Sequence, residues 1–251
     1  MPRWRSVFIG TATMALLLFA WEAAGWAGWL NLALLPAPSQ IAPQLWQLLV
    51  SGSFAVPLGQ TLWMLFVGYS IACLFGVLIG LFMGINVYAY GLLEPLVEIV
   101  RPIPKPALIP ALVIFLGIGS AMKISTVALA CMFPILIGTL QGVRGVDPIM
   151  TATARTLGCS RSATIWKVVL PSALPMILTG MRVSLGMGLA LVILAEMLAA
   201  ETGVGFLVLD LQRSFQVRSM YAWIVILAIV GLALNAIFER VEDRLVPWRA
   251  K

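Results

Sequence analysis

Long apolar stretches recur along this chain, and each is about as long as a helix must be to cross a lipid bilayer. Such a helix needs roughly 20 apolar residues at a rise of about 1.5 Å per residue. Of the 251 residues, 61% are hydrophobic and only 10% are charged, whereas soluble domains carry about 25% charged residues. Because so little charge cannot cover a soluble surface, the sequence predicts an all-α, polytopic membrane protein.

The spacing of the apolar stretches predicts six transmembrane helices. The third is expected to be broken, because prolines at positions 102, 104 and 106 forbid a continuous helix. A further short helix is expected to end near Val50, between the first two spans. The expected spans are Phe8–Leu30, Leu58–Ile85, Leu92–Val100 with Ala107–Leu116, Ile124–Leu140, Ala173–Leu198 and Tyr221–Phe238.

Cationic residues are unevenly distributed over the connections between these spans. They gather near both ends of the chain and in the loop of residues 142–171, whereas residues 31–57 carry no charge. By the positive-inside rule, the cation-rich regions and both termini are expected in the cytoplasm. This divides the chain into a first span with its external loop (1–57), a core (58–245) and a cytoplasmic tail (246–251).

Several kinds of chemistry are excluded by residues that the sequence lacks. Histidine is absent, and the three cysteines are scattered without metal-ligand or disulfide spacing. None of the four lysines follows a glycine, so the chain has no phosphate-binding loop of the P-loop type. The net charge of +6 comes without a basic stripe, which argues against nucleic acid. We therefore expect no catalytic residue, metal or cofactor in this chain.

The loop of residues 142–171 carries the clearest functional signal. Met150–Leu157 has the composition of a short helix, and Gly158 stands where a glycine commonly ends one. Ser160–Val169 predicts a second short helix, closed by Leu170 and Pro171. A helix–glycine–helix unit at the membrane surface is rigid enough to transmit a push from a partner.

The spacing of this loop resembles the EAA motif of ABC-importer permeases: Glu-Ala-Ala, three residues, Gly, nine residues, Ile, one residue, Leu-Pro. Ala152 stands where Glu is usual, Thr153 replaces an Ala, and Val168 replaces the Ile. The lost acid predicts docking by shape and apolar fit, with no salt bridge from position 152. The resemblance implies that a separate ATPase docks on this coupling loop (residues 142–171), at Ala152, Thr153, Ala154, Arg155, Thr156, Leu157, Gly158, Cys159, Ser160, Leu170 and Pro171.

The resemblance extends from about Leu35 to the C-terminus and is closest to the branch that imports nitrate, taurine and alkanesulfonates. The matching segments are Leu35–Gln40, Arg101–Pro104, Ala107–Pro110, Phe115–Gly119, Gly142–Pro148 and Ala154–Gly158. The resemblance implies a bacterial inner-membrane permease with the type I importer fold. Its solute would be a small anion delivered by a periplasmic binding protein.

The same resemblance implies that the chain lies in the lipid bilayer and has two further protein partners besides the binding protein. ATP and Mg would be bound by an ATPase dimer on the cytoplasmic side, and a second permease copy, expected to be identical, would complete the path. An ion-gradient-driven secondary transporter is the alternative, but it would need carboxylates or histidines midway through the spans. A membrane-embedded enzyme would need clustered polar catalytic groups.

Charged residues inside or near the spans leave two interpretations open. Arg182 lies within the fifth span, where charges are costly and face protein or water. It is either an electrostatic guide for an anionic solute or a structural pair or snorkelling side chain, and the structural role is favoured. With Ser184 and Met187 it marks the predicted solute path. Glu196, near the outer end of that span, is expected at the membrane interface.

Three further patterns concern helix packing. Small residues recur every fourth position in the second span, and they predict close helix packing inside one subunit, with a subunit–subunit contact as the alternative. Glu94 and Glu98 are expected to pair locally with Arg101 and Lys105. The segment Glu201–Met220 is too short to span and predicts either an interfacial helix or a gate for solute. The small residues of the second span are Gly68, Ala72, Gly76, Gly80 and Gly84.

Overall fold

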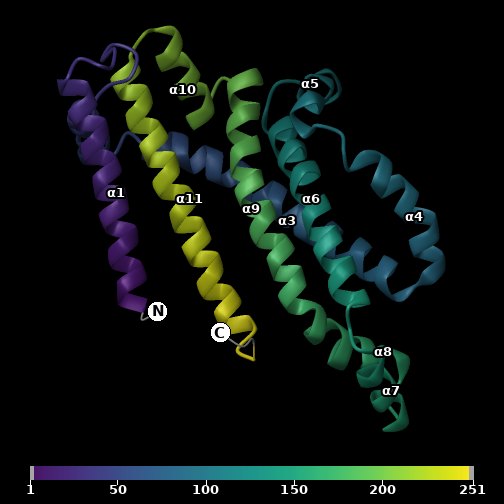
Figure 1. Ribbon diagram of the computed structural model, residues 1–251. Coiled ribbons are helices and arrows are strands. Elements are labelled where there is room, and N and C mark those ends of the chain that lie inside the picture. The colour runs from purple at the N-terminus through teal and green to yellow at the C-terminus, as the bar shows by residue number, and fades with distance from the viewer. Residues whose placement is uncertain (1–2, 249–251) are drawn as a thin grey trace.

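The protein is a bundle of long helices with shorter helices at both ends, as the computed structural model shows (Figure 1). The structure describes residues 3–248, with side chains from Phe8 onward. The elements are α1 (Arg3–Trp26), α2 (Pro38–Ser51), α3 (Ala55–Ile85), α4 (Val87–Val100), the 3₁₀ turn η1 (Lys105–Leu108), α5 (Ile109–Leu116), α6 (Ser120–Arg144), α7 (Pro148–Thr156), α8 (Arg161–Thr164), the π-helical turn η2 (Ile165–Val169), α9 (Leu170–Ala199), α10 (Val204–Arg213) and α11 (Val217–Leu245).

Five of the six predicted spans are single helices within residues 3–248 that are long and apolar enough to cross a membrane. The α4 helix and the η1–α5 segment, bent by 87°, pass the same test together and give a sixth when the pair is counted as one broken span. The break coincides with the prolines at 102, 104 and 106, as predicted from their missing N–H groups. The first span is shorter than expected and ends at Trp26 rather than Leu30, because the chain turns at Gly28 with φ +72°.

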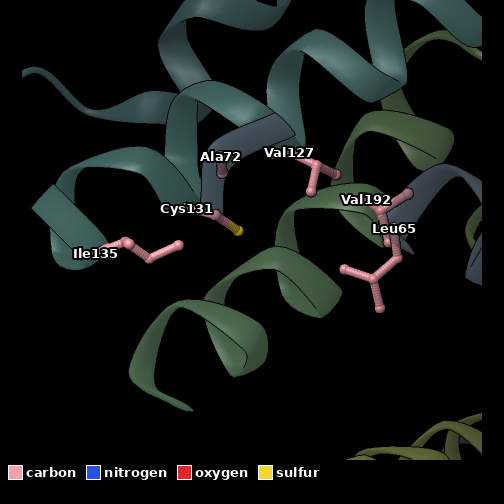
Figure 2. Close-up of a cluster of buried hydrophobic side chains, with 6 residues drawn as sticks. All are labelled: Leu65, Ala72, Val127, Cys131, Ile135 and Val192. Carbon is pink, nitrogen blue, oxygen red and sulfur yellow. The ribbon is translucent and has the colours of Figure 1, made fainter. Parts of the chain in front are cut away.

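The core lies where α3, α6 and α9 pack together. Its buried side chains come from all three helices, as Figure 2 shows: Leu65, Ala72, Val127, Cys131, Ile135 and Val192. The every-fourth-residue stripe of α3 is what lets α6 come so close. A Cβ atom added at Gly80 would lie 2.7 Å from the Thr139 Cβ, and one at Gly68 would lie 2.7 Å from the Val127 Cβ. The prediction of close packing inside one subunit is therefore confirmed.

The contact between α6 and α9 relies on small residues from both helices. A Cβ atom at Gly138 would lie 2.8 Å from the Met176 carbonyl oxygen, and one at Gly180 would lie 2.6 Å from the Pro134 oxygen. Because apolar burial gives helices in lipid little reason to associate, such close backbone packing is a main source of helix association. The α3–α6–α9 unit is therefore the rigid frame on which the remaining elements are mounted.

The peripheral elements follow the predicted up-and-down course. The start of α1, the end of α11 and the α7–α8 pair lie toward one end of the bundle, and α5 and α10 lie toward the other (Figure 1). Helix α1 stands apart from the core and is tied to α2 near its end. The Glu22 carboxylate accepts hydrogen bonds from the Ser39 backbone N–H at 3.0 Å and from its hydroxyl at 2.7 Å.

Glu196, which is expected at the membrane interface, is buried inside the protein near the end of α9. Its side chain is 0% exposed, and it accepts hydrogen bonds from the Thr61 hydroxyl at 2.9 Å and from Gly205 N–H at 2.9 Å. The Thr61 hydroxyl also accepts from Val204 N–H at 3.0 Å. Two otherwise unpaired N–H groups at the start of α10 are thus satisfied, and a carboxylate at a helix N-terminus is electrostatically favoured.

Candidate functional site

The coupling loop (residues 142–171) has a defined geometry that its sequence explains. Asp147 caps α7 by accepting a hydrogen bond from Ile149 N–H at 2.8 Å, and Pro148 follows in the first turn. Gly158 ends α7 in the left-handed region with φ +79°. The N–H of Gly158 donates to the Arg155 oxygen and that of Cys159 to the Ala154 oxygen, both at 3.0 Å. This is the Schellman pattern expected when a glycine follows a helix.

The second helix of the loop begins as predicted but does not end where predicted. Ser160 caps α8, with its hydroxyl accepting from Ala163 N–H at 3.2 Å. The helix does not close at Leu170 and Pro171. It passes through the π-helical turn η2 into α9, so one helical stretch runs from Arg161 to Ala199. Pro171 has no N–H to donate, and a π-turn next to it is one way a helix absorbs such a break.

The surface of the coupling loop is more apolar than its position outside the spans requires. Ile149 is 72% exposed, Leu157 78% and Trp166 64%. The predicted docking residues Ala152 and Thr153 are also exposed, whereas Ala154 is buried and anchors α7. Figure 1 shows α7 and α8 projecting beyond the end of the bundle, where no other labelled helix covers them. Exposed apolar side chains on helices that project from the bundle are typical of a protein–protein contact.

A cavity of about 630 Å³ lies between the break of the third span and the helices α6 and α9. From α6 it is lined by Phe133 and Gln141, and from α9 by Thr179 and Met187. From the broken span it is lined by Arg101 and Lys105. Phe133 is close to the middle of α6, so the cavity reaches the middle of this span.

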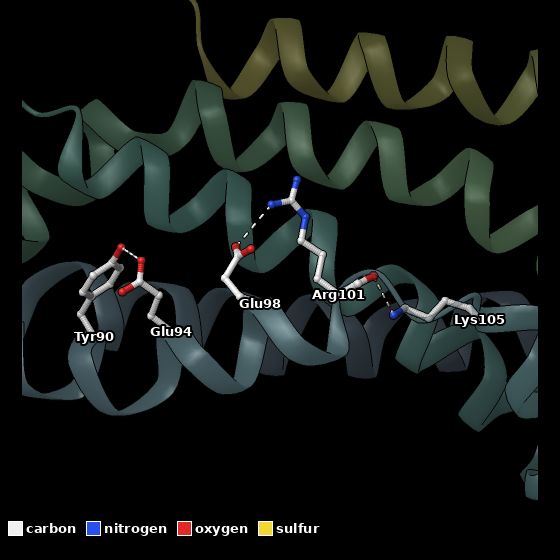
Figure 3. Close-up of polar contacts among 5 residues, drawn as sticks. All are labelled: Tyr90, Glu94, Glu98, Arg101 and Lys105. Carbon is white, nitrogen blue, oxygen red and sulfur yellow. Dashed lines mark hydrogen bonds and ion pairs between the residues drawn. The ribbon is translucent and has the colours of Figure 1, made fainter.

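The two cations of the cavity are held differently. Arg101 forms an ion pair with Glu98 at 3.4 Å, and about half of its side chain is exposed. Lys105 donates to the carbonyl oxygens of Val100 at 2.8 Å and Arg101 at 3.2 Å, and its ammonium lies 4.4 Å from the centre of the Phe133 ring. Figure 3 shows Lys105 folded back on the end of α4.

The expected local pairing of Glu94 and Glu98 is therefore confirmed only in part. Glu98 pairs with Arg101, but Lys105 caps carbonyl groups instead, and Glu94 accepts a hydrogen bond from the Tyr90 hydroxyl (Figure 3). These acids line a second cavity of about 440 Å³, which shares Arg101 with the first. The Arg144 guanidinium lies 3.4 Å from the centre of the Tyr90 ring on this side. The acidic groups thus lie beside the first cavity and not in it.

The three residues of the predicted solute path are separated by the fold. Met187 lines the large cavity. Ser184 is 0% exposed and donates to the Met181 oxygen at 2.8 Å. Arg182 lies 2.5 Å from the Glu242 carboxylate of α11, so the structural-pair interpretation of this residue is confirmed. Arg182 and Ser184 are absent from the residues that line this cavity.

Two groups of residues were not predicted from the sequence. For Ile149, the available signal was an exposed apolar side chain in a largely polar helix, whereas Trp166 lies in the apolar segment Ile165–Val169. For Arg101 and Lys105, the sequence predicts helix pairing and not a place in the lining of the cavity. The available signal was a pair of cations beside a helix break within a span, where charges are rare.

The chain is similar to proteins that take part in solute transport. A family described as "binding-protein-dependent transport system inner membrane component" matches residues 76–251. The taurine transport system permease protein TauC of Escherichia coli strain K12 is 33% identical over 258 residues, which cover 100% of this chain and 93% of that protein. The putative aliphatic sulfonates transport permease protein SsuC of Bacillus subtilis strain 168 is 30% identical over 240 residues, which cover 96% of this chain and 87% of that protein.

Further similarities extend to nitrate transport and to solved structures. The nitrate import permease protein NrtB of Leptolyngbya laminosa is 30% identical over 185 residues, which cover 74% of this chain and 66% of that protein. Among solved structures, an inward-facing form of the MetNI methionine ABC transporter superposes with a TM-score of 0.68 at 19% identity. That match covers 76% of this chain and 95% of the other, and it shows a shared fold.

Proposed function

This chain belongs to the family of inner-membrane components of binding-protein-dependent transport systems, and we propose that it is the permease subunit of an ATP-driven importer for a small anion. Its relatives are named for taurine, aliphatic sulfonates and nitrate, and the proposed solute is of this kind. The chain has the type I ABC importer permease fold and is a transport protein, not an enzyme. ATP and Mg are bound by a separate ATPase dimer in the cytoplasm, a periplasmic protein delivers the solute, and a second copy of the permease completes the path.

The exposed apolar surface of the coupling loop is the observation that carries this proposal. Its side chains, Ile149, Leu157 and Trp166, are exposed by 64% or more at the end of the bundle that holds both described termini. The ATPase docks there by apolar fit around Gly158. Position 152 is an exposed alanine, so it contributes no salt bridge.

The continuity between the coupling loop and α9 supports a mechanism. The helical stretch that begins at Arg161 runs to Ala199 and lines the large cavity with Met176, Val183 and Met187. Closure of the ATPase dimer on ATP displaces the loop, and the helix carries that displacement to the cavity wall. The cavity then alternates between the two sides of the membrane as a two-state switch biased by the nucleotide.

The docking claim is tested by Leu157→Gln, with Leu34→Gln as the matched control. Both leucines are exposed, by 78% and 65% respectively, but Leu34 lies in the connection after α1, far along the bundle from the coupling loop. The expected result is that only Leu157→Gln loses the ATPase subunit when tagged permease is purified from membranes. Equal retention of the ATPase by both variants would refute docking at this surface.

The transport claim needs its own experiment. The assembled importer in proteoliposomes, supplied with its binding protein, is expected to accumulate a radiolabelled sulfonate only when ATP is present on the ATPase side. Collapse of ion gradients with ionophores should leave this uptake unchanged. Uptake that needs a gradient but no ATP would instead support the secondary-transporter alternative.

A further inference from the structure

We propose that the large cavity between α6, α9 and the broken third span binds an organic anion, with Lys105 and Arg101 contacting its charged head and Phe133 and Met187 its short alkyl part. This inference rests on the proposed function and names the substrate class of the importer: a small alkanesulfonate-type anion rather than an inorganic one. The residues come from three separate spans, so only the tertiary structure brings them together.

The charge of the cavity is the first argument. Its lining residues include two cations, Arg101 and Lys105, and no aspartate or glutamate. Lys105 has carbonyl oxygens as its hydrogen-bond partners, so no carboxylate neutralises its ammonium, and that group has a third N–H to donate. A cation retained at membrane depth is costly and is typical of a substrate pathway.

The apolar part of the cavity lining is the second argument. This apolar lining consists of Phe133 and Ile137 from α6 and of Val183, Met187, Ala190 and Leu191 from α9. An apolar wall gains about 0.8 kcal/mol for each CH₂ group that it removes from water. Nitrate has no such group, whereas each methylene of an alkanesulfonate is stabilised there. The volume of about 630 Å³ is ample for a sulfonate with a short chain.

The ion pair between Arg101 and Glu98 explains how the head group of an anion can gain access to Arg101. Their ion pair is long, at 3.4 Å, and both side chains are more than half exposed, so it is weak. Arg101 borders both cavities. An arriving anion therefore has to displace only a weak partner from Arg101, while Lys105 is held in place by the end of α4.

The charge argument is tested with a thiol probe in the cavity. The Met187→Cys variant, whose parent side chain is 42% exposed, is modified with an anionic reagent, 2-sulfonatoethyl methanethiosulfonate, and a cationic one, 2-(trimethylammonio)ethyl methanethiosulfonate. The chain without this change supplies the background from Cys73, Cys131 and Cys159. The Leu34→Cys variant supplies the reagents' rates at an exposed position away from the cavity.

The expected result is a ratio of anionic to cationic rates that is higher at position 187 than at position 34. Lys105→Gln should lower the ratio by about tenfold, as one unit charge acting across a partly screened cavity would. Arg101→Gln should also lower it, and Lys105→Arg should restore it. Arg240→Gln, which removes an exposed cation of α11 outside the cavity, should leave it unchanged. Equal ratios at positions 187 and 34 would overturn the proposal.

The alkyl argument is tested by protection of the same thiol. The concentration of methane-, ethane-, propane- and butanesulfonate that halves the modification rate should fall by about threefold to fourfold per methylene. Nitrate should protect no better than chloride. Protection by nitrate equal to that by butanesulfonate would show that the apolar wall is not used, and absence of protection by every anion would rule out the site.

These measurements separate the site from the proposed function, because thiol modification needs neither ATP nor the ATPase. An importer that takes up sulfonate with ATP but shows no charge preference at position 187 would refute the cavity proposal alone. A charge preference without ATP-dependent uptake would refute the importer proposal alone.

Discussion

Two single residues decide how the ends of the bundle are built. At one end, the buried carboxylate of Glu196 joins Thr61 of α3 to the first N–H groups of α10. Nearby, Lys123 of α6 donates to the Thr202 carbonyl oxygen at 3.2 Å. At the other end, Gly158 supplies the left-handed turn that separates α7 from α8. Glu196 is needed because the first N–H groups of α10 require an acceptor. Gly158 is needed because the turn requires a positive φ.

The Glu196→Gln variant is expected to be destabilised by about 2 kcal/mol. Its amide NH₂ would face the donors of Thr61 or Gly205, and leaving a buried group unsatisfied costs roughly 1–3 kcal/mol. For a protein of this size that loss lowers the melting temperature by about 4–8 °C. The measurement is thermal unfolding in detergent, with exposed Glu201→Gln as the control. Equal melting temperatures for the two variants would contradict the structural role.

The Gly158→Ala variant is expected to weaken ATPase association and uptake. An added Cβ at Gly158 would meet nothing within 4 Å, so any effect comes from the left-handed backbone, which costs roughly 1–2 kcal/mol for alanine. Gly91→Ala is the matched control, since it has equal space and no positive φ. Gly158→Asn should fall between wild type and Gly158→Ala. If both alanine variants retain the ATPase equally, the turn at Gly158 does not position the docking surface.

At the scale of elements, the long helices pack through contacts of small residues rather than through large apolar side chains. The α3–α6 pair brings Gly80 against Thr139 and Gly84 against Val143, while α6 meets α9 through Gly138 and Gly180. In these contacts the glycine backbone lies against backbone atoms or against the side chains of Thr139 and Val143 at or next to their Cβ atoms, and such atoms cannot move far to make room. The long α9 helix is continuous with the second helix of the coupling loop, so the loop is joined directly to this closely packed unit.

The Gly80→Val variant is expected to disrupt the core. A Cβ at this position would already lie 2.7 Å from the Leu136 oxygen and 2.7 Å from the Thr139 Cβ, so α3 and α6 must separate. Overpacking of this kind costs about 1–3 kcal/mol or more. Folded yield and melting temperature in detergent provide the measurement, and Gly91→Val, in open space on α4, is the comparison. A Gly80→Val protein as stable as the Gly91→Val protein would show that the helices are not so closely packed.

At the scale of the whole molecule, the up-and-down course of the spans places the start of α1, the end of α11 and the coupling loop at one end. The cations of the sequence gather in these same regions. The positive-inside rule predicts that this end lies in the cytoplasm. The opposite end holds the connection after α1 and the helix α10, where a binding protein would approach.

This orientation predicts the labelling of two cysteines by a membrane-impermeant maleimide. In a background with alanine at positions 73, 131 and 159, Leu34→Cys should be labelled in intact cells stripped of the outer membrane. Trp248→Cys should be labelled only after the inner membrane is opened. Both parent side chains are at least 60% exposed, so access within the protein is comparable. Labelling of Trp248→Cys in intact spheroplasts would reverse the assigned topology.

By itself, the sequence determined the class of the protein, its six spans and the break in the third. Each of these follows from a local cause: span length from bilayer thickness, the break from prolines at 102, 104 and 106, and the helix–Gly158–helix turn from one glycine. The sequence also contains the motif spacing of the coupling loop, which indicated the family.

The tertiary structure decided which residues meet. Glu196 lies near a span end in the sequence, yet the fold buries it because α10 turns back onto Thr61 and the start of α10 needs an acceptor. Arg182 is partnered by Glu242, 60 positions along the chain. Lys105, Phe133 and Met187 share one cavity although they belong to three spans. Such contacts depend on the way helices cross, and periodicity within one helix does not identify which helix packs against it.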